Sequence, residues 1–290
     1  DLDINDRQTM ISYFRKGMDE PVTMSTVAGS ELYSIPTYLA KKRGVGQWFF
    51  GNDAIRQSQL SLASGIDGLL ARAKNDEYIL IDTEEYAASD LLLIFIRKLL
   101  SMPGAGGNAG VPIAKVVITV ENLDEATSLM FSRILSKLGL VPSQVLLCGH
   151  RESFYYYALS QDKSLFLHDV MLFDYTTSEL KECVLKLGER RSPQLVEMIY
   201  KNHGTIAFDK DRTFDEIVQK SLVGEVISSV YLIGEAFDGD WMELSLKRLC
   251  QGRRVFMGKN LYSKGACFAA CDDIFDVKLK GHYEIGRAHV

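Results

Sequence analysis

The segment 169–187 constrains the fold of this chain most strongly. An apolar run ends at Asp174, a short polar turn follows, and the residues from Glu179 alternate, with Cys183 and Leu185 on one face. An apolar run before a short polar turn is typical of one strand, and alternating apolar and polar residues after the turn are typical of another. The segment therefore predicts a β-hairpin. A hydrophobic core does not require a carboxylate at the bend. The segment therefore predicts a β-containing fold and indicates Asp174 as a functional candidate.

The first residues of the chain repeat this arrangement. Leu2–Ile4 is typical of a strand end, 5–8 has turn-forming composition, and 9–14 is rich in β-prone residues. Asp3 then takes the place in the first hairpin that Asp174 takes in the second. We expect two related halves, each opened by a hairpin that carries an acid.

The clearest supersecondary pattern follows the first hairpin. Val116–Val120 is typical of a buried strand, and Asp124 of the N-cap of an amphipathic helix. Gly139 ends that helix as its C′ residue, before a second strand at 145–148. This order predicts a strand–helix–strand unit on a largely parallel sheet. The second half shows the same order of elements at 230–233, 241–250 and 254–256.

Taken together, the segments resemble the nucleotide-binding domain of the actin and Hsp70-like ATPase superfamily, in a divergent bacterial Hsp70-like branch. The similar segments occur in the same order along the chain, from the first phosphate loop to the start of a late helix: 2–9, 35–39, 47–54, 116–120, 173–174, 231–235 and 264–266. The resemblance implies an α/β, actin-like ATPase fold (ribonuclease H-like). Two related lobes, each with a hairpin and βαβ units, would surround a central cleft that holds ATP or ADP with Mg²⁺.

The resemblance also implies a division of the chain. We expect a first lobe at 1–150 and a second lobe at 151–283 with a shortened upper subdomain. The last residues, 284–290, resemble the translation of a common sequencing adapter and are interpreted as an artefact. We further expect a clipped first strand and a natural chain that continues beyond about Tyr283.

Site residues are transferred from the family position by position. Asp3 and Asp174 match the two aspartates that hold Mg²⁺ through water, and Glu152 matches the glutamate of the segment that orients the attacking water. All three are expected to be catalytic if the site works. The expected nucleotide-binding residues are Asn5, Asp6, Arg7, Thr176, Thr177, Gly234 and Glu235.

Both phosphate loops lack the family's glycines. A backbone cradle for phosphate needs left-handed conformations, which cost a non-glycine residue about 1–2 kcal/mol each. Asp6 and Glu179 would add negative charge, and Glu235 replaces a glycine of the adenosine motif. We therefore expect a protein with weak or no ATP hydrolysis that acts as a nucleotide-sensing or interaction scaffold. The alternatives are an active Mg²⁺-dependent ATPase or chaperone-like protein with altered loops, and a sugar or acetate kinase relative.

A purely structural interpretation stays open for the same residues. Asp3 and Asp174 would then cap tight turns, and Glu152 would be a surface residue at a strand-to-helix junction. Three histidines are interpreted as ordinary loop or surface residues: His150, His168 and His203.

Composition limits the classes of binding partner that we expect for this chain. A net charge of −5 argues against nucleic acid and anionic membranes, which favour a basic face. Five cysteines without framework spacing suggest a reducing compartment, and the most apolar window is too short to span a bilayer. Cys267 and Cys271 share a helix face and read as buried side chains rather than metal ligands. We expect a cytoplasmic protein with an unidentified protein partner or client.

Overall fold

The protein is described by a computed structural model at residues 1–15, 17–102, 113–176, 178–189, 192–206, 208–275 and 283–285. It is a mixed α/β protein that divides into two compact units. The first contains Asp1–Ser153 and Tyr262–Ile274, and the second contains Phe154–Leu261 and Phe275–Val290. The expected boundary at residue 150 differs from this division, since Tyr262–Ile274 belongs with the first unit.

The main sheet of the first unit contains six strands: β1 (Leu2–Ile4), β2 (Gln8–Tyr13), β3 (Val22–Thr23), β4 (Ile35–Pro36), β10 (Val116–Val120) and β11 (Val145–Gly149). Their order is β11-β10-β1-β2-β3, and β4 pairs with β2 beside this path. β1 and β2 form the expected antiparallel hairpin, while β1, β10 and β11 run parallel. β3 is a short strand of two residues, Val22–Thr23.

An inserted segment follows β4. It contains strands β5 (Leu39–Lys42), β6 (Trp48–Phe50), β7 (Ala63–Ile66), β8 (Tyr78–Ile81) and β9 (Glu84–Ala87) and helices α1 (Gly51–Gln59), α2 (Leu69–Lys74) and α3 (Ala88–Leu100). β6, β5 and β7 form one small sheet, and β8 and β9 form a hairpin. α1 begins at Gly51, and no side chain caps it.

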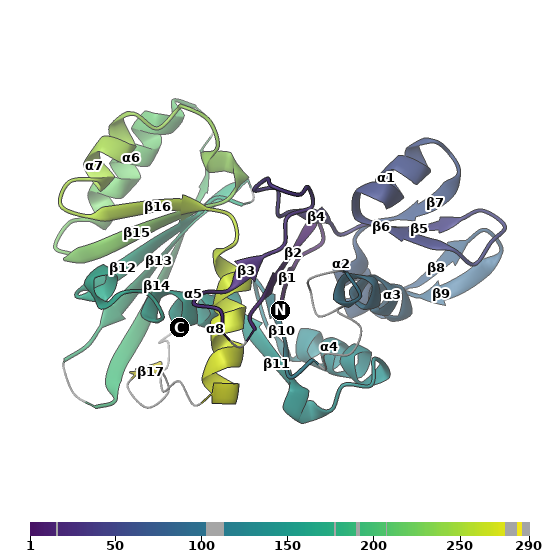
Figure 1. Ribbon diagram of the computed structural model, residues 1–290. Coiled ribbons are helices and arrows are strands. Elements are labelled where there is room, and N and C mark those ends of the chain that lie inside the picture. The colour runs from purple at the N-terminus through teal and green to yellow at the C-terminus, as the bar shows by residue number, and fades with distance from the viewer. Residues whose placement is uncertain are drawn as a thin grey trace. The chain divides into compact units, whose positions relative to one another are not determined.

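The remaining helices of the first unit are α4 (Glu125–Lys137) and α8 (Leu261–Phe275), and α5 (His150–Leu159) begins in it. The Asp124 carboxylate accepts the Thr127 amide and Gly139 has φ +81°, so the expected start and stop of α4 are confirmed. Figure 1 shows α3 and α4 near one another, and their apolar faces share a core with β1 and β10.

The sheet of the second unit contains β12 (Asp169–Asp174), β13 (Glu179–Leu187), β14 (Gln194–Thr205), β15 (Ile227–Ile233), β16 (Arg254–Gly258) and β17 (Tyr283–Ile285). The order is β16-β15-β12-β13-β14-β17. β12 is antiparallel to β13 and parallel to β15, and β13 is antiparallel to β14. The hairpin expected at 169–187 is therefore confirmed.

Helices α6 (Lys210–Ser221) and α7 (Leu244–Leu249) cover one face of this sheet (Figure 1). Phe214 and Val218 of α6 pack into a core with β12, β13 and β15. Asp215 of α6 binds Arg248 of α7 through both carboxylate oxygens, at 2.5 and 2.8 Å. This ion pair lowers the pKa of Asp215.

The two sheets repeat one plan. If β4 and β17 are left out and the other five strands of each sheet are numbered along the chain, both sheets have the order 5-4-1-2-3. Strands 1, 4 and 5 are parallel, and strand 2 lies antiparallel between strands 1 and 3. Five strands of the two sheets thus follow the same order. None of the helices in the described part of the chain has the length and apolar composition needed to cross a membrane.

Candidate functional site

Asp3 lies inside β1 rather than at the bend of the hairpin. Leu2 and Ile4 face the main core of the first unit, so the alternation of the strand directs Asp3 to the opposite face. There its Oδ1 lies 2.8 Å from Nε2 of His150, the first residue of α5. The His150 ring stacks on Tyr262 with centroids 3.7 Å apart. Asp3 thus forms a largely buried acid–imidazole pair, and neither it nor His150 fits its structural interpretation as a turn cap or an ordinary loop residue.

The turn of the first hairpin is closed by its own side chains. Asn5 Oδ1 accepts the backbone amides of Arg7 at 2.8 Å and Gln8 at 2.9 Å. The Asp6 carboxylate accepts the amides of Leu70 and Ala71 in the first turn of α2, at 2.7 and 3.2 Å. Asn5 therefore caps the turn, and Asp6 anchors the inserted segment to the hairpin.

The second hairpin is closed in the same manner. Asp174 Oδ1 accepts the amide and the hydroxyl of Thr176, at 2.9 and 2.5 Å, as the turn-cap interpretation of Asp174 expects. Gly234 follows β15 with φ +110°, and a Cβ there would lie 2.4 Å from the Thr176 nitrogen. The position thus requires glycine because the hairpin backbone lies against it. Glu235 is exposed, and Thr177 lies outside the described residues.

Glu152 acts at the junction of β11 and α5. Its Oε2 accepts the amide of Gly149 at 2.8 Å, and the residue is exposed. A carboxylate in the first turn of a helix interacts favourably with the unpaired amides there. This placement agrees with the structural interpretation of Glu152 as a surface residue at a strand-to-helix junction.

The expected site residues are divided between the two units. The first unit holds Asp3, Asn5, Asp6, Arg7 and Glu152, and the second holds Asp174, Thr176, Gly234 and Glu235.

We tested whether these residues fit a nucleotide phosphate and its Mg²⁺. A phosphate needs free backbone amides, but those of Arg7, Gln8 and Thr176 are bound within their own hairpins. The carboxylate of Asp3 that would hold the hydrated metal is bound by His150. In this arrangement the described residues of the two hairpins do not fit the phosphate and metal that the family resemblance implies.

The sequence did not indicate a second buried acid, Glu182. It lies on β13 and is almost fully buried; its Oε2 binds His203 Nε2 and Ser221 Oγ, each at 2.6 Å. His203 is thus not an ordinary loop residue. The available signal was positional, because Glu182 falls between Leu180 and Val184 on the face of β13 that packs into the core.

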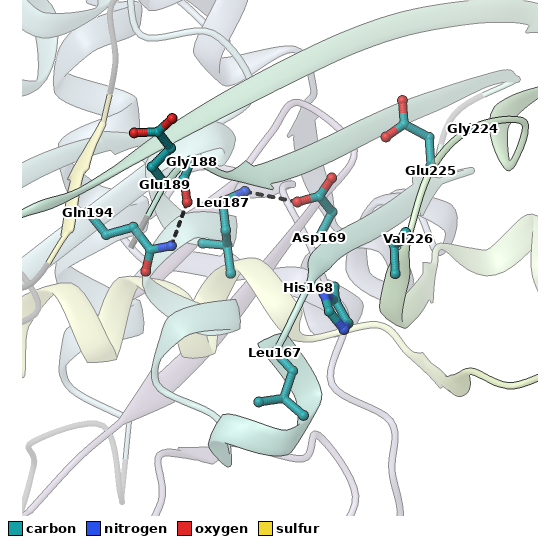
Figure 2. A pocket seen from close by; sticks show the side chains of 10 residues that line it. All are labelled: Leu167, His168, Asp169, Leu187, Gly188, Glu189, Gln194, Gly224, Glu225 and Val226. Atoms are coloured by element: carbon teal, nitrogen blue, oxygen red, sulfur yellow. Dashed lines mark hydrogen bonds between the residues drawn. The ribbon is translucent and has the colours of Figure 1, made fainter. Parts of the chain in front are cut away.

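A pocket of about 450 Å³ lies at the beginning of β12 in the second unit. Figure 2 shows its ten lining side chains, among them the carboxylates of Asp169, Glu189 and Glu225. Asp169 accepts the Leu187 amide at 2.9 Å, and Glu225 pairs with Lys186 at 2.7 Å. Burial raises the pKa of Asp169. None of its lining residues is an expected site residue.

Among the described residues, no group of three or more histidine, cysteine, aspartate or glutamate side chains could hold a metal ion. Cys267 and Cys271 are buried in α8, and burial raises the pKa of the Cys267 thiol to about 12. This agrees with their interpretation as buried side chains.

Comparison with known proteins completes the description of the chain. No curated protein matches it. Residues 20–286 match the family described as "Family of unknown function (DUF5716) C-terminal". Because the match covers most of the sequence, the chain belongs to the DUF5716 family, in the part that the description calls C-terminal.

Proposed function

We propose that this protein is a divergent actin and Hsp70-like domain that has weak or no ATP hydrolysis and acts as an interaction scaffold for a protein partner or client. The observation that carries the proposal is the closure of both hairpin turns by their own side chains. Asn5 binds two amides of the first turn, and Asp174 binds Thr176 in the second.

The family assignment within this proposal rests on topology. Two sheets with the strand order 5-4-1-2-3, each opened by an acid-bearing hairpin, are what a duplicated ribonuclease H-like fold would produce. Strand order is a stronger argument than the short motifs, because it involves five of the six strands of each sheet. Fold alone does not decide activity, so the activity is argued from the hairpins.

The hydrogen bonds that close the first turn allow an estimate of how much they weaken phosphate binding. An intramolecular hydrogen bond contributes about 0.5–1.5 kcal/mol, so releasing the two Asn5 bonds would cost about 1–3 kcal/mol. A tenfold change in affinity corresponds to about 1.4 kcal/mol, and this cost alone would weaken phosphate binding about 5- to 150-fold. Binding of a hydrated Mg²⁺ by Asp3 would also require its hydrogen bond to His150 to break, which adds to this cost.

The test is a thermal-shift and calorimetric titration with ATP, ADP and AMP, with and without Mg²⁺, beside a phosphate-release assay. A ligand at one hundred times its dissociation constant would stabilise the protein by about 2.7 kcal/mol. For the wild type we expect no melting shift at millimolar nucleotide and no phosphate release above background.

Asn5→Gly tests the reason for this expectation, because it frees the amides of Arg7 and Gln8. We expect this variant to gain a melting shift with nucleotide. Asp162→Gly is the matched control, since it removes a similar bond from a carboxylate to the Ser164 amide elsewhere. A Mg²⁺-ATP shift in the wild type that Asp174→Ala abolishes, together with phosphate release, would overturn the proposal in favour of the active ATPase.

A further inference from the structure

The β8–β9 hairpin of the inserted segment exposes two large apolar side chains on one face. Tyr78 is 70% exposed and Leu80 is 69% exposed. The two are separated by one residue on β8, so they project from the same side of the hairpin. Their cross-strand partners on that side are Ala87 and Glu85. A tyrosine and a leucine side by side on a strand form a ridge, which we call the Tyr78–Leu80 ridge.

The backbone of β8 offers hydrogen bonds at the same place. The Ala88 amide donates to the Glu77 carbonyl, which fixes the alternation of the ladder. By this alternation Ile79 bonds to β9, while the amides and carbonyls of Tyr78 and Leu80 point away from it. No other strand in the described part of the chain pairs with β8. β8 is therefore an edge strand. The backbone amides and carbonyls that point away from β9 belong to Tyr78 and Leu80, its two most exposed residues.

The opposite face of the hairpin holds β8 in place. Tyr86 of β9 packs edge-to-face against Trp48 of β6, with ring centroids 5.5 Å apart. The buried Lys41 of β5 binds Glu84 at 3.2 Å and Asp82 at 3.5 Å. This packing and these ion pairs hold the hairpin on the side opposite the Tyr78–Leu80 ridge. The unpaired edge of β8 therefore keeps a strand conformation.

The hairpin is also acidic. Between positions 76 and 85 the sequence has five acidic residues and no lysine or arginine. Arg72, Arg133 and Lys41 lie within ion-pair distance of four of these acids. Glu85 is exposed beside Leu80 and takes part in no ion pair among the described residues. The edge therefore combines apolar side chains, free backbone groups and negative charge.

We propose that β8 is a docking edge for an extended segment of another protein in which apolar and basic residues alternate. The segment adds a strand to β8 and its apolar side chains contact the Tyr78–Leu80 ridge. Its basic side chains alternate onto the opposite face and are attracted by the net negative charge of the hairpin. Strand addition of this kind uses main-chain hydrogen bonds for affinity and alternate side chains for specificity. A second copy of the chain is disfavoured, because pairing two β8 edges would bring two acidic hairpins together.

The probe is a fluorescent nine-residue peptide of alternating valine and lysine, titrated with the full chain and followed by fluorescence anisotropy. Leu80→Pro removes the outward amide but leaves the bonds to β9, because proline is tolerated where an edge amide faces solvent. Tyr78→Thr removes an apolar side chain and keeps a β-prone residue. Val141→Ser is the matched control, since Val141 is also exposed in the first unit. Circular dichroism melts check that each variant is folded.

We expect saturable binding to the wild type and to Val141→Ser, and at least tenfold weaker binding to Leu80→Pro and Tyr78→Thr. The same peptide with glutamate in place of lysine should not bind, and Glu85→Lys should weaken binding of the lysine peptide. Failure of the wild type to bind, or unchanged binding by Leu80→Pro, overturns the proposal. So does a dimer in sedimentation that Leu80→Pro dissociates, because the edge would then pair with a second copy.

Discussion

The pair of Asp3 and His150 allows a quantitative test of how the first unit is held together. Only 12% of the Asp3 side chain and 16% of the His150 side chain are exposed, and their atoms lie 2.8 Å apart. A hydrogen bond to a charged group contributes about 1.5–3 kcal/mol. The stack of His150 on Tyr262 should add about 0.5–1.5 kcal/mol beyond burial. We expect His150→Ala to lose both terms and His150→Phe to lose mainly the first.

The assay is urea denaturation of Asp3→Asn, His150→Phe, their double variant and the wild type, analysed as a double-mutant cycle. The expected coupling free energy is about 1.5–3 kcal/mol, because either substitution alone removes the hydrogen bond between the imidazole and a carboxylate. His150→Ala should be less stable than His150→Phe by about the stacking term. A coupling below about 0.5 kcal/mol would mean that the two residues act independently, and the buried pair would then have no energetic role.

Three further results are expected. Gly265→Ala should lower the free energy of unfolding, measured by urea denaturation, by about 1–3 kcal/mol, because its Cβ would lie 2.0 Å from a carbonyl oxygen of α5. Gly46→Ala should be near neutral, because the space around Gly46 is open. Since burial raises the pKa of Asp169 in the folded state, its charged form opposes folding above that pKa; Asp169→Asn should therefore stabilise the protein at pH 7, with a gain that shrinks as the pH falls towards about 4. If the midpoint gain is the same at both pH values, the burial argument is wrong. A thiol reagent at pH 8 should modify the exposed Cys250 rapidly and Cys267, whose pKa is about 12, only after unfolding, and Cys250→Ser should remove the fast phase.

The sequence was sufficient for the elements whose causes are local. The 169–187 hairpin follows from residue alternation around a polar turn, and the ends of α4 follow from a carboxylate at Asp124 and a glycine at Gly139. Each of these features depends on residues within a few positions of one another. The repeat of hairpin and βαβ units was visible for the same reason.

Boundaries and caps were less predictable where the signal was weak. The third strand is only Val22–Thr23, and α3 begins at Ala88 without a side-chain cap, although Ser89 and Asp90 have capping chemistry. In such places tertiary packing determines where an element begins, because a strand needs a partner and a helix needs a face to bury.

The function of each acidic side chain was decided by tertiary structure. Sequence alone identified Asp3 as chemically unusual, but its partner His150 is 147 residues away, and the amide that Asp6 caps at Leu70 is 64 residues away. Glu182 likewise binds His203 and Ser221 from two other elements. A carboxylate can bind a metal, a phosphate loop, a helix end or an imidazole with the same oxygens. Sequence fixes its chemistry, and only the folding of distant segments against one another selects which of these partners it binds.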